Sequence, residues 1–503
     1  MKRLSFGYIL LFMALLLFLT RLIELQLIFG GRNRALADGN RLRPLVRPAP
    51  RGLIFDRYGQ PLVANRPLYQ RCESEDNCQI ISRDEAFKLE AEGGSASEKI
   101  RSSPLRYYPF GEALAQVLGY LDHDGQPRTG LEKQADSWLK GQDGGEIIEV
   151  DTFGQRLRSL GQGQPLSGRD LNVSLDAHLS QVAYQALEGL QGAVVVTEAK
   201  TGQVLVLVSS PAFDPNQIDP NLLTHKDKPF FPRAVAGAYP PGSIFKIITT
   251  VAGLEEKKID RQTLFTDPGF IRVGDFTYRN WYFSQYGRTE GSLNVVRALT
   301  RSTDTFFYKV GEWVGVEALV SWAKKFNLGA LTGIDLPAEV AGHLPTPDQK
   351  FYLGNLYHLA IGQGELLITP LQANLIASVI ANDGKLCRPR ILNTESRIMN
   401  TGSENLNNNS VFSIYDSSLA HCQDLGLKKE TIELIKEGMV GACSPGGTAW
   451  PLFAFKPQVA CKTGTAEYGD KNGKTHAWLV AFAPVDEPQI VISVLVEGGG
   501  EGS

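Results

Sequence analysis

The sequence predicts an α/β (α+β) fold, in which one mixed sheet is covered by helices, preceded by an N-terminal region with a single membrane-spanning helix. Two groups of strand-like segments, at residues 192–210 and 458–497, flank a long segment in which apolar residues recur at helical spacing. Strands at both ends of a domain are expected to close on each other into one sheet. The third observation is an uncharged apolar run near the N-terminus.

That run, at residues 4–20, reads LSFGYILLFMALLLFLT, and LIELQLIF continues it after Arg21. A membrane span needs about 20 apolar residues. A signal peptide would need a small-residue cleavage site soon after the run, whereas Ala35-Leu36-Ala37 lies well beyond it. We therefore expect an uncleaved anchor at 4–29 and a cytoplasmic tail at 1–3. Basic residues on both sides leave the orientation open from charge alone.

The composition limits the classes of function. A chain of 503 residues is long enough for two or three domains. The formal net charge of −3 gives no reason to expect nucleic acid as a partner. No Cys-x-x-Cys pair or His/Cys cluster predicts a metal site.

All six cysteines follow the anchor, which is compatible with an oxidising compartment. Cys72 and Cys78 flank a polar loop, so we expect a local disulfide there. Pairing of Cys422 with Cys443 is a weaker expectation. For Cys387, a free buried thiol is as good an expectation as a disulfide. For Cys461, which lies in an apolar strand, a free buried thiol is the better expectation.

Two regions follow the anchor. Residues 30–170 begin with a basic, proline-containing stretch, continue with a polar stretch at 71–103, and are expected to form a separate N-terminal domain. Residues 171–503 are expected to form the second domain. It opens with a helical pattern at 174–190 and a β-hairpin that turns at Thr201-Gly202, and it ends with three strands.

Within the second domain, Tyr239-Pro240-Pro241-Gly242 precedes Ser243-Ile244-Phe245-Lys246 and a helical pattern. Pro and Gly mark a turn, so a helix is expected to begin at or near Ser243. Ser243 and Lys246 then share one face of its first turn. A serine hydroxyl needs an adjacent base to act as a nucleophile, and a lysine with a lowered pKa can serve. Ser-x-x-Lys occurs by chance in long sequences, and serine is a common helix cap.

Two later motifs give this pair a specific meaning. Ser302-Thr303-Asp304 lies in a helical segment, and Lys462-Thr463-Gly464 lies in a strand. Taken by itself, each of these two motifs could have only a structural role. In this order, S-x-x-K, S-x-N/D and K-T-G form the active-site signature of penicillin-binding proteins and serine β-lactamases.

The resemblance extends over nearly the whole chain. RGLIFDRYGQPLVAN at 51–65 resembles the opening motif of class B penicillin-binding proteins, and GAVVVTEAKTGQVLVLVSSPAFDPN resembles the start of their transpeptidase domain. The sequences TGIDLPAE, AIGQGELLITPLQ and GGTAW resemble segments between the second and third motifs. YPPGSIFK and the TFFY that follows Asp304 are similar to the cell-elongation branch, the penicillin-binding protein 2-like enzymes.

This resemblance implies a penicillin-binding transpeptidase fold on a pedestal, or dimerisation-type, domain. It implies that Ser243 attacks the penultimate D-Ala of a stem peptide, that Lys246 takes the proton and that Ser302 passes a proton to the leaving D-Ala. Asp304 would position Lys246, and Lys462 would support the proton network. Substrate would be held by Thr463, Gly464 and Thr465, with backbone N–H groups of Ser243 and Thr465 as the oxyanion hole.

The resemblance also implies partners and a location. They are stem peptides ending in D-Ala-D-Ala, β-lactams, a membrane glycosyltransferase of the SEDS type and other elongation proteins. The chain would cross the bacterial inner membrane once, with its N-terminus inside and its bulk outside. No cofactor is implied. Some relatives carry a zinc site formed with a His and a Cys, but Arg288 and Thr303 stand in the corresponding segment here, so we predict no zinc.

Alternatives to an elongation transpeptidase are a division-type transpeptidase, a D,D-carboxypeptidase or β-lactamase, and a non-catalytic β-lactam sensor. A bifunctional class A enzyme would need a glycosyltransferase domain, for which the roughly 170 residues before the hairpin offer no candidate. Family members normally continue with a helix after the segment VLVEGGGEGS, so we expect residues 171–503 to lack the C-terminal helix of the domain.

Overall fold

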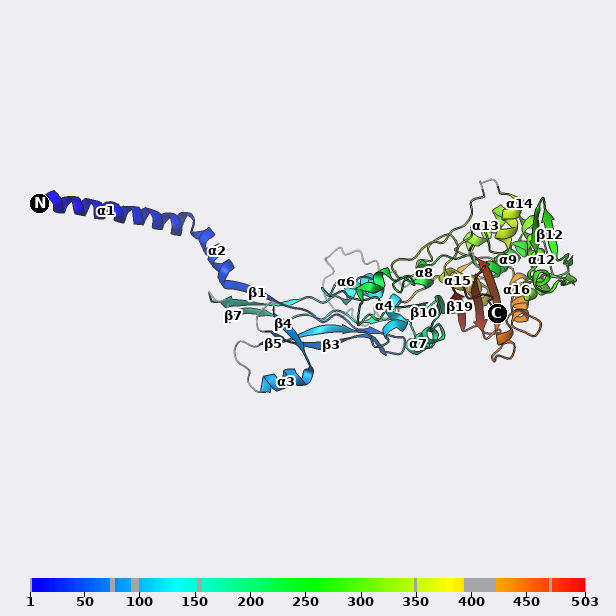
Figure 1. Cartoon of the computed structure of the whole chain (residues 1–503), viewed down its shortest axis with the longest axis horizontal. Helices are drawn as coiled ribbons and strands as arrows, with labels where there is room; N and C mark the ends of the chain where they lie inside the picture. The colour runs from blue at the N-terminus through cyan, green and yellow to red at the C-terminus, as the bar shows by residue number, and fades with distance from the viewer. Residues whose placement is uncertain are drawn as a thin grey trace. The chain divides into compact units, whose positions relative to one another are not determined.

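The computed structural model describes residues 2–72, 77–91, 99–151, 156–347, 351–392, 422–469 and 473–502. The chain divides into two compact units (Figure 1). The first unit comprises Met1–Gly52, Asn65–Leu105 and Trp138–Arg169, and the second comprises Leu53–Ala64, Arg106–Ser137 and Asp170–Ser503. The predicted N-terminal domain at 30–170 therefore contributes residues to both units.

The first unit begins with the apolar helix α1 (Lys2–Ile23), a π-helical turn η1 (Glu24–Ile28) and α2 (Gly30–Arg41). The segment Phe6–Ile28 has a mean hydropathy of 2.3 and is 0% buried, as expected for a helix whose apolar side chains face lipid. It fits a single-pass membrane anchor and agrees with the predicted span at 4–29.

The rest of the first unit is mainly antiparallel strands. β1 (Leu42–Arg47), β6 (Gly144–Val150) and β7 (Arg156–Gly163) pair in the order β1-β6-β7. The polar stretch at 71–103 contributes β4 (Cys78–Ile81) and α3 (Arg83–Ala91); its residues 73–76 and 92–98 lie outside the described part of the chain. β3 (Pro61–Cys72) and β5 (Lys99–Tyr107) pair with each other. Each of these strands has residues in both units.

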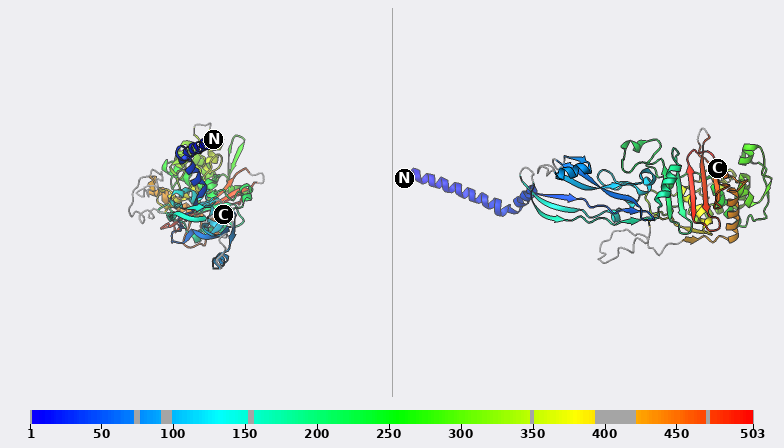
Figure 2. Two further views of the ribbon diagram at one scale, coloured as in Figure 1. Left: turned by 90° about the vertical axis from the view of Figure 1, so that its left-hand side faces the viewer. Right: turned by 90° about the horizontal axis from the view of Figure 1, so that it is seen from below.

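The second unit is built on a sheet with the strand order β10-β9-β19-β18-β17. The predicted hairpin is formed by β9 (Gly192–Glu198) and β10 (Val204–Ser210). The three predicted C-terminal strands are β17 (Ala460–Glu467), β18 (Thr475–Ala483) and β19 (Ile490–Val496). β19 pairs with β9, so the two ends of the domain close on each other as predicted (Figure 2). All four neighbouring pairs run antiparallel, so the sheet is purely antiparallel where a mixed sheet was expected.

Helices cover both faces of this sheet. α15 (Pro370–Ala381) is buried along its whole length and contacts β19, β9 and β18. It begins with a capping box, in which Thr369 and Gln372 satisfy each other's backbone N–H groups. On the opposite face, α7 (Ala177–Ala186) packs against β10 and contributes to a separate apolar cluster. The β-branched runs of β9 and β10 are buried on both faces for this reason.

The segment between the two strand groups is mainly helical, as predicted. Its longer helices are α9 (Lys246–Glu255), α11 (Val295–Arg301), α12 (Asp304–Val314), α13 (Val316–Lys325), α14 (Leu353–Ala360) and α16 (Lys429–Ala442). It also contains short strand pairs that periodicity could not reveal, because strands of two to four residues show too few alternations. They are β11 (Phe265–Thr266) with β14 (Ser292–Leu293), β12 (Phe270–Val273) with β13 (Phe276–Arg279), and β15 (Lys385–Cys387) with β16 (Cys422–Asp424).

The remaining elements are short. In the second unit they are β2 (Ile54–Phe55), η2 (Gly111–Leu114), α4 (Ala115–Leu118), α5 (Gly130–Gln134), β8 (Leu171–Asn172), η3 (Pro220–Thr224), α8 (Arg233–Ala236), η4 (Gly242–Phe245), α10 (Trp281–Tyr286) and η7 (Trp450–Leu452). α6 (Asp136–Leu139) spans the boundary.

The disulfides correct two predictions. Cys72 pairs with Cys78, as expected. Cys422 pairs with Cys387, and Cys443 pairs with Cys461, so the expected Cys422–Cys443 bridge and the free thiols at Cys387 and Cys461 are wrong. Each of these bridges depends on which segments the fold brings together, and such connectivity cannot be read from cysteine spacing.

Candidate active site

Ser243 lies on a sharp turn that approaches the edge strand β17. It belongs to the 3-10 turn η4, and α9 begins at Lys246, so the predicted helix start is correct to within one turn. Gly242 precedes it with φ +55, a conformation that favours glycine. A Cβ on Gly242 would lie 2.6 Å from the carbonyl oxygen of Thr465. The absence of a side chain at Gly242 therefore allows the serine turn to reach the strand that carries Lys462-Thr463-Gly464.

Lys246 is buried, with 0% of its surface exposed. Its Nζ donates to the carbonyl oxygen of Ser302 (2.8 Å), to Ser302 Oγ (3.2 Å) and to Asp304 Oδ1 (2.6 Å). A lysine ammonium has three donors. These three bonds therefore fix the position of the amine, one helical turn after Ser243.

Lys462 reaches the same serine from the strand β17. It too is 0% exposed, and its Nζ donates to Ser302 Oγ (2.9 Å) and to the carbonyl oxygen of Thr463 (2.9 Å). Ser302 terminates α11 in the left-handed conformation, with φ 56, which is unusual for a residue other than glycine. Ser302 Oγ thus links the two buried lysines, and a proton can pass between them through this hydroxyl.

Burial lowers the pKa of both lysines, because desolvation disfavours the charged form. The carboxylate of Asp304 opposes this effect at Lys246 and raises its pKa in part. The pKa of Lys462 falls further below its ordinary value, since burial is reinforced by the neighbouring charge of Lys246. The site therefore disfavours a state in which both lysines are positively charged at the same time.

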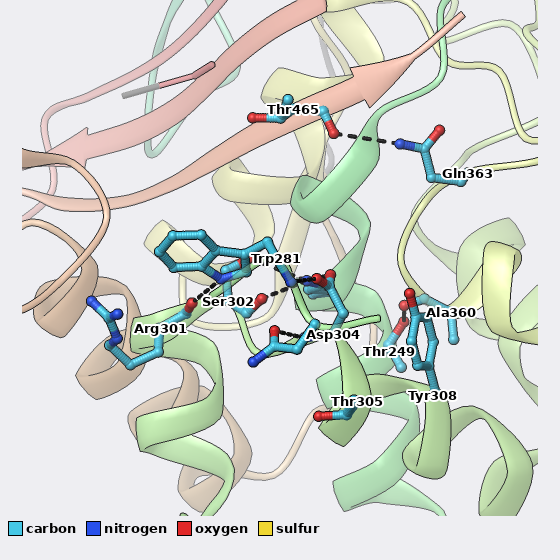
Figure 3. Close-up of polar contacts among 12 residues, drawn as sticks. Thr249, Trp281, Arg301, Ser302, Asp304, Thr305, Tyr308, Ala360, Gln363 and Thr465 are labelled. Atoms are coloured by element: carbon cyan, nitrogen blue, oxygen red, sulfur yellow. Dashed lines mark hydrogen bonds and ion pairs between the residues drawn. The ribbon is translucent and has the colours of Figure 1, made fainter. Parts of the chain in front are cut away.

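Asp304 is held by one backbone group and one side-chain group from a neighbouring segment. Its Oδ2 accepts from the N–H of Trp281 (2.9 Å), and its own N–H donates to Asn280 Oδ1 (3.0 Å). The Trp281 indole donates to the carbonyl oxygen of Arg301, so the ring lies beside the turn that carries Ser302 and Asp304 (Figure 3). These contacts leave Asp304 Oδ1 directed at Lys246.

The Lys-Thr-Gly residues line β17. Thr463 Oγ1 lies 2.8 Å from Thr448 Oγ1, which belongs to the loop after α16. A Cβ on Gly464 would lie 2.9 Å from the carbonyl oxygen of Pro241, so this glycine permits close approach to the serine turn. The side chain of Thr465 is exposed, and its carbonyl oxygen accepts from Gln363 Nε2 at 3.4 Å (Figure 3).

Hydrogen bonds join four of the predicted catalytic residues directly: Lys246, Ser302, Asp304 and Lys462. Ser243 joins them through the turn η4, and Thr463, Gly464 and Thr465 extend along β17. Sequence reasoning missed Asn280, Trp281 and Thr448. The segment GGTAW contains Thr448 and was singled out only as a resemblance; nothing in the sequence spacing pointed to Asn280 or Trp281.

Within the described residues, one group of acidic and histidine side chains has the spacing of metal ligands: Asp122, His123 and Asp124. It is largely open to solvent, and none of its members belongs to the site around Ser302. The absence of zinc beside the second motif stays a prediction.

Comparison with known proteins identifies the family of the chain. The model of the penicillin-binding protein transpeptidase domain matches residues 192–503, and that of the penicillin-binding protein dimerisation domain matches residues 78–173. The chain therefore belongs to the penicillin-binding protein transpeptidase family.

Among individual relatives, the chain is 31% identical to the peptidoglycan D,D-transpeptidase MrdA of Escherichia coli K12, over 96% of this chain and 89% of that protein. It resembles the penicillin-binding protein PBP2 of Helicobacter pylori solved in complex with MreC, with a TM-score of 0.74, 26% identity, and coverage of 91% and 95% of the two chains. A chain of a peptidoglycan synthase complex gives a TM-score of 0.74 and 28% identity, with coverage of 99% and 95%.

Proposed function

We propose that this chain is an elongation-type peptidoglycan D,D-transpeptidase that crosslinks stem peptides through an acyl-enzyme on Ser243. The observation that carries the proposal is that two buried lysines both donate to Ser302 Oγ, and that one of them, Lys246, follows Ser243 by one helical turn. Membership of the family and the named D,D-transpeptidase relatives support the reaction type.

In the first half-reaction, Ser243 Oγ attacks the carbonyl carbon of the penultimate D-Ala. Lys246 in its neutral form accepts the hydroxyl proton, which burial favours by lowering the pKa of the amine. The bond from that carbonyl carbon to the nitrogen of the terminal D-Ala then breaks. Ser302 Oγ gives a proton to the leaving amine and regains one from a lysine, so the proton taken from Ser243 leaves with D-Ala.

The negative charge that develops on the carbonyl oxygen needs preorganised donors. The backbone N–H groups of Ser243 and Thr465 are the proposed pair, and the close approach of Gly242 to Thr465 supports this pairing. Each such donor contributes about 3 kcal/mol to the stability of the transition state. The hydroxyls of Thr463 and Thr465 would hold the terminal carboxylate of the stem peptide, and Lys462 would support the proton network.

In the second half-reaction, the amine of another stem peptide attacks the acyl carbon and releases Ser243 Oγ. The amine loses a proton to the lysine network, and the serine regains one. A β-lactam would open its ring on Ser243 and remain attached. Since no leaving group departs from the opened ring, the acyl-enzyme would persist.

The apolar N-terminal helix and the proposed substrate together support a location for the chain. Because peptidoglycan lies outside the cytoplasmic membrane, the N-terminus would be inside and the second unit outside. The H. pylori relative was solved with MreC, and another similar chain belongs to a peptidoglycan synthase complex. By analogy, we propose elongation proteins and a SEDS-type glycosyltransferase as partners of this chain.

Labelled penicillin distinguishes this proposal from a non-catalytic sensor. Wild type should give a labelled band that Ser243→Ala lacks, and mass spectrometry should locate the adduct on the peptide that contains Ser243. A wild-type protein without a band would contradict the proposal. Incubation with two stem peptides should give a crosslinked dimer; release of D-Ala without dimer would indicate a carboxypeptidase.

A further inference from the structure

A buried carboxylate outside the three motifs lies behind the catalytic cluster. Asp267 is 3% exposed and follows β11. Among the described residues, its oxygens accept four hydrogen bonds. The donors are the N–H groups of Gly269 and Glu290, the Nδ2 of Asn280 and the hydroxyl of Thr305, at 2.7–2.9 Å. None of these donors is a cation, so the carboxylate is stabilised by oriented neutral groups alone.

Asn280 connects this carboxylate to the catalytic Asp304. It is 0% exposed, and its Nδ2 donates to Asp267 Oδ2 at 2.9 Å. The other end of the same amide, Oδ1, accepts the N–H of Asp304 at 3.0 Å. The bond to Asp267 fixes which end of the amide faces Asp304, because only the NH₂ group can donate to a carboxylate.

The contact between Asn280 and Asp304 is reciprocal. Asp304 is the first residue of α12, whose N-cap Thr303 makes no side-chain capping bond, so Asn280 Oδ1 caps α12 from another segment. Trp281 is the first residue of α10, whose N-cap Asn280 likewise makes no capping bond to its own helix. Asp304 Oδ2 accepts the N–H of Trp281 and so caps α10 in return. Each helix start therefore orients the other.

We infer that Asn280, anchored by Asp267, is a positioning residue that fixes the carboxylate of Asp304 against Lys246. The inference rests on the proposed function, in which Lys246 is the base. With Oδ2 held by Trp281, only Oδ1 is directed at Lys246 Nζ. Loss of Asn280 removes the acceptor of the Asp304 N–H, one of the two hydrogen bonds that this segment makes to Asp304, and the ion pair to Lys246 loosens.

Several charged and titratable groups act on this pair. Lys246 faces Asp304 on α12 and Lys462 on β17. Asp304 interacts with both lysines and with the phenol of Tyr308. The charge of Glu467 also raises the pKa of that phenol. Of these groups, Asp304 is the one that raises the pKa of Lys246. A looser Asp304 should therefore let Lys246 lose its proton at lower pH.

The test measures two quantities on the full-length chain in detergent. One is the rate of Ser243 acylation by labelled penicillin against pH. The other is the titration of Lys246, followed by NMR of ¹³Cε-labelled lysine and assigned with Lys246→Arg. The variants are Asn280→Ala, Asp267→Asn, and the exchange Asp267→Asn with Asn280→Asp. The control is Asn355→Ala, an exposed asparagine on α14.

For Asn280→Ala we expect acylation to fall by about 10- to 100-fold, the cost of a small misplacement of a catalytic group. Lys246 should titrate at lower pH than in wild type. In the exchange variant, the carboxylate now at position 280 can still accept the Asp304 N–H, and the amide now at position 267 can still donate to that carboxylate. The rate should therefore recover part of the loss; recovery is incomplete because the amide nitrogen at position 267 cannot accept the N–H of Glu290. Asp267→Asn alone should change both quantities in the same direction as Asn280→Ala but less, and Asn355→Ala should match wild type.

Two outcomes overturn the inference: an unchanged Lys246 titration in Asn280→Ala and Asp267→Asn, or an exchange variant as slow as Asn280→Ala at equal melting temperature. If Asn280→Ala does not fold, the isosteric Asp267→Asn decides alone by its titration. Failure of the proposed function looks different, because wild type would then form no Ser243 adduct. In that case the NMR titration of Lys246 in the variants, compared with wild type, still tests the positioning role of Asn280.

Discussion

At the scale of single residues, two opposing effects act on the proton of Lys246. Its burial lowers the pKa of the amine, while the carboxylate of Asp304 at 2.6 Å raises it. The burial effect is the larger, so the pKa of Lys246 stays below its ordinary value even beside a carboxylate. An aspartate at position 304 is therefore compatible with base catalysis, because its charge only partly restores the proton affinity that burial removes.

The variant Asp304→Asn isolates this effect. Without the carboxylate, burial acts unopposed, the pKa of Lys246 falls further, and the acid limb of the acylation profile should move to lower pH. The maximal rate should fall about 10-fold or more, because the ion pair also positions the amine. The measurement is the second-order rate of β-lactam acylation across the acid and alkaline limbs of the profile. An exposed Asp275→Asn serves as control, and a superimposable Asp304→Asn profile would show that Asp304 does not tune the lysine.

A glycine decides whether the serine turn reaches β17. Gly242 has φ +55, and an added Cβ would meet the Thr465 carbonyl oxygen at 2.6 Å. Gly274 has φ +57 and no atom within 4 Å of an added Cβ. Alanine at Gly274 should cost about 1 kcal/mol in free energy of unfolding, from the left-handed backbone alone.

Alanine at Gly242 should cost about 1–3 kcal/mol more than alanine at Gly274, because it adds overpacking to the same backbone strain. It should also slow Ser243 acylation by about 100-fold, since the turn would be displaced from β17. Thermal melts and acylation rates of the two variants give the comparison. Equal melting temperatures and equal rates would show that the close approach is not required.

At the scale of elements, a disulfide fixes the strand that carries Lys462. Cys461 precedes Lys462 on β17, and its partner Cys443 follows α16 and leads into the loop with Thr448. Thr448 in turn contacts Thr463. The bridge therefore clamps β17 to the loop that holds its threonine, in addition to limiting the unfolded chain.

Replacing both Cys443 and Cys461 by serine should lower the free energy of unfolding by about 3 kcal/mol, as expected for a loop of this length. Acylation of Ser243 should also slow, because β17 is no longer clamped. Removing the Cys72–Cys78 bridge, which lies in the first unit, should leave acylation unchanged. Chemical denaturation and labelled-penicillin kinetics measure both effects. Unchanged acylation without the Cys443–Cys461 bridge would limit its role to stability.

Local patterns made most elements of the second unit predictable. The hairpin at Thr201-Gly202 and the three C-terminal strands follow from alternation and turn residues, which act over a few positions. The lysines and serines of the candidate site could be found from the sequence because each motif is a short linear pattern. Asn280 was not, since its bond to Asp304 joins segments 24 residues apart with no shared spacing. The pairing of Cys443 with Cys461 depends in the same way on tertiary approach.

At the scale of the whole molecule, the candidate catalytic residues lie in the second unit, and the membrane helix lies in the first. The segment Phe6–Ile28 is 0% buried, so its side chains contribute nothing to either core. Insertion in a bilayer is the environment that compensates such exposed apolar surface. Membrane attachment and acylation should therefore be separable.

Deleting residues 2–29 should release the chain from the membrane fraction without changing its chemistry. The remaining chain should stay in the supernatant after high-speed centrifugation and should acylate Ser243 at the wild-type rate within about twofold, since no core contact is lost. The full-length chain should sediment with membranes and resist extraction by high salt, because an inserted helix is held by burial of apolar surface rather than by charge. Sedimentation and penicillin labelling test both statements. A deleted chain that still sediments with membranes would indicate a second attachment surface, and one that no longer acylates would show that the helix supports the site.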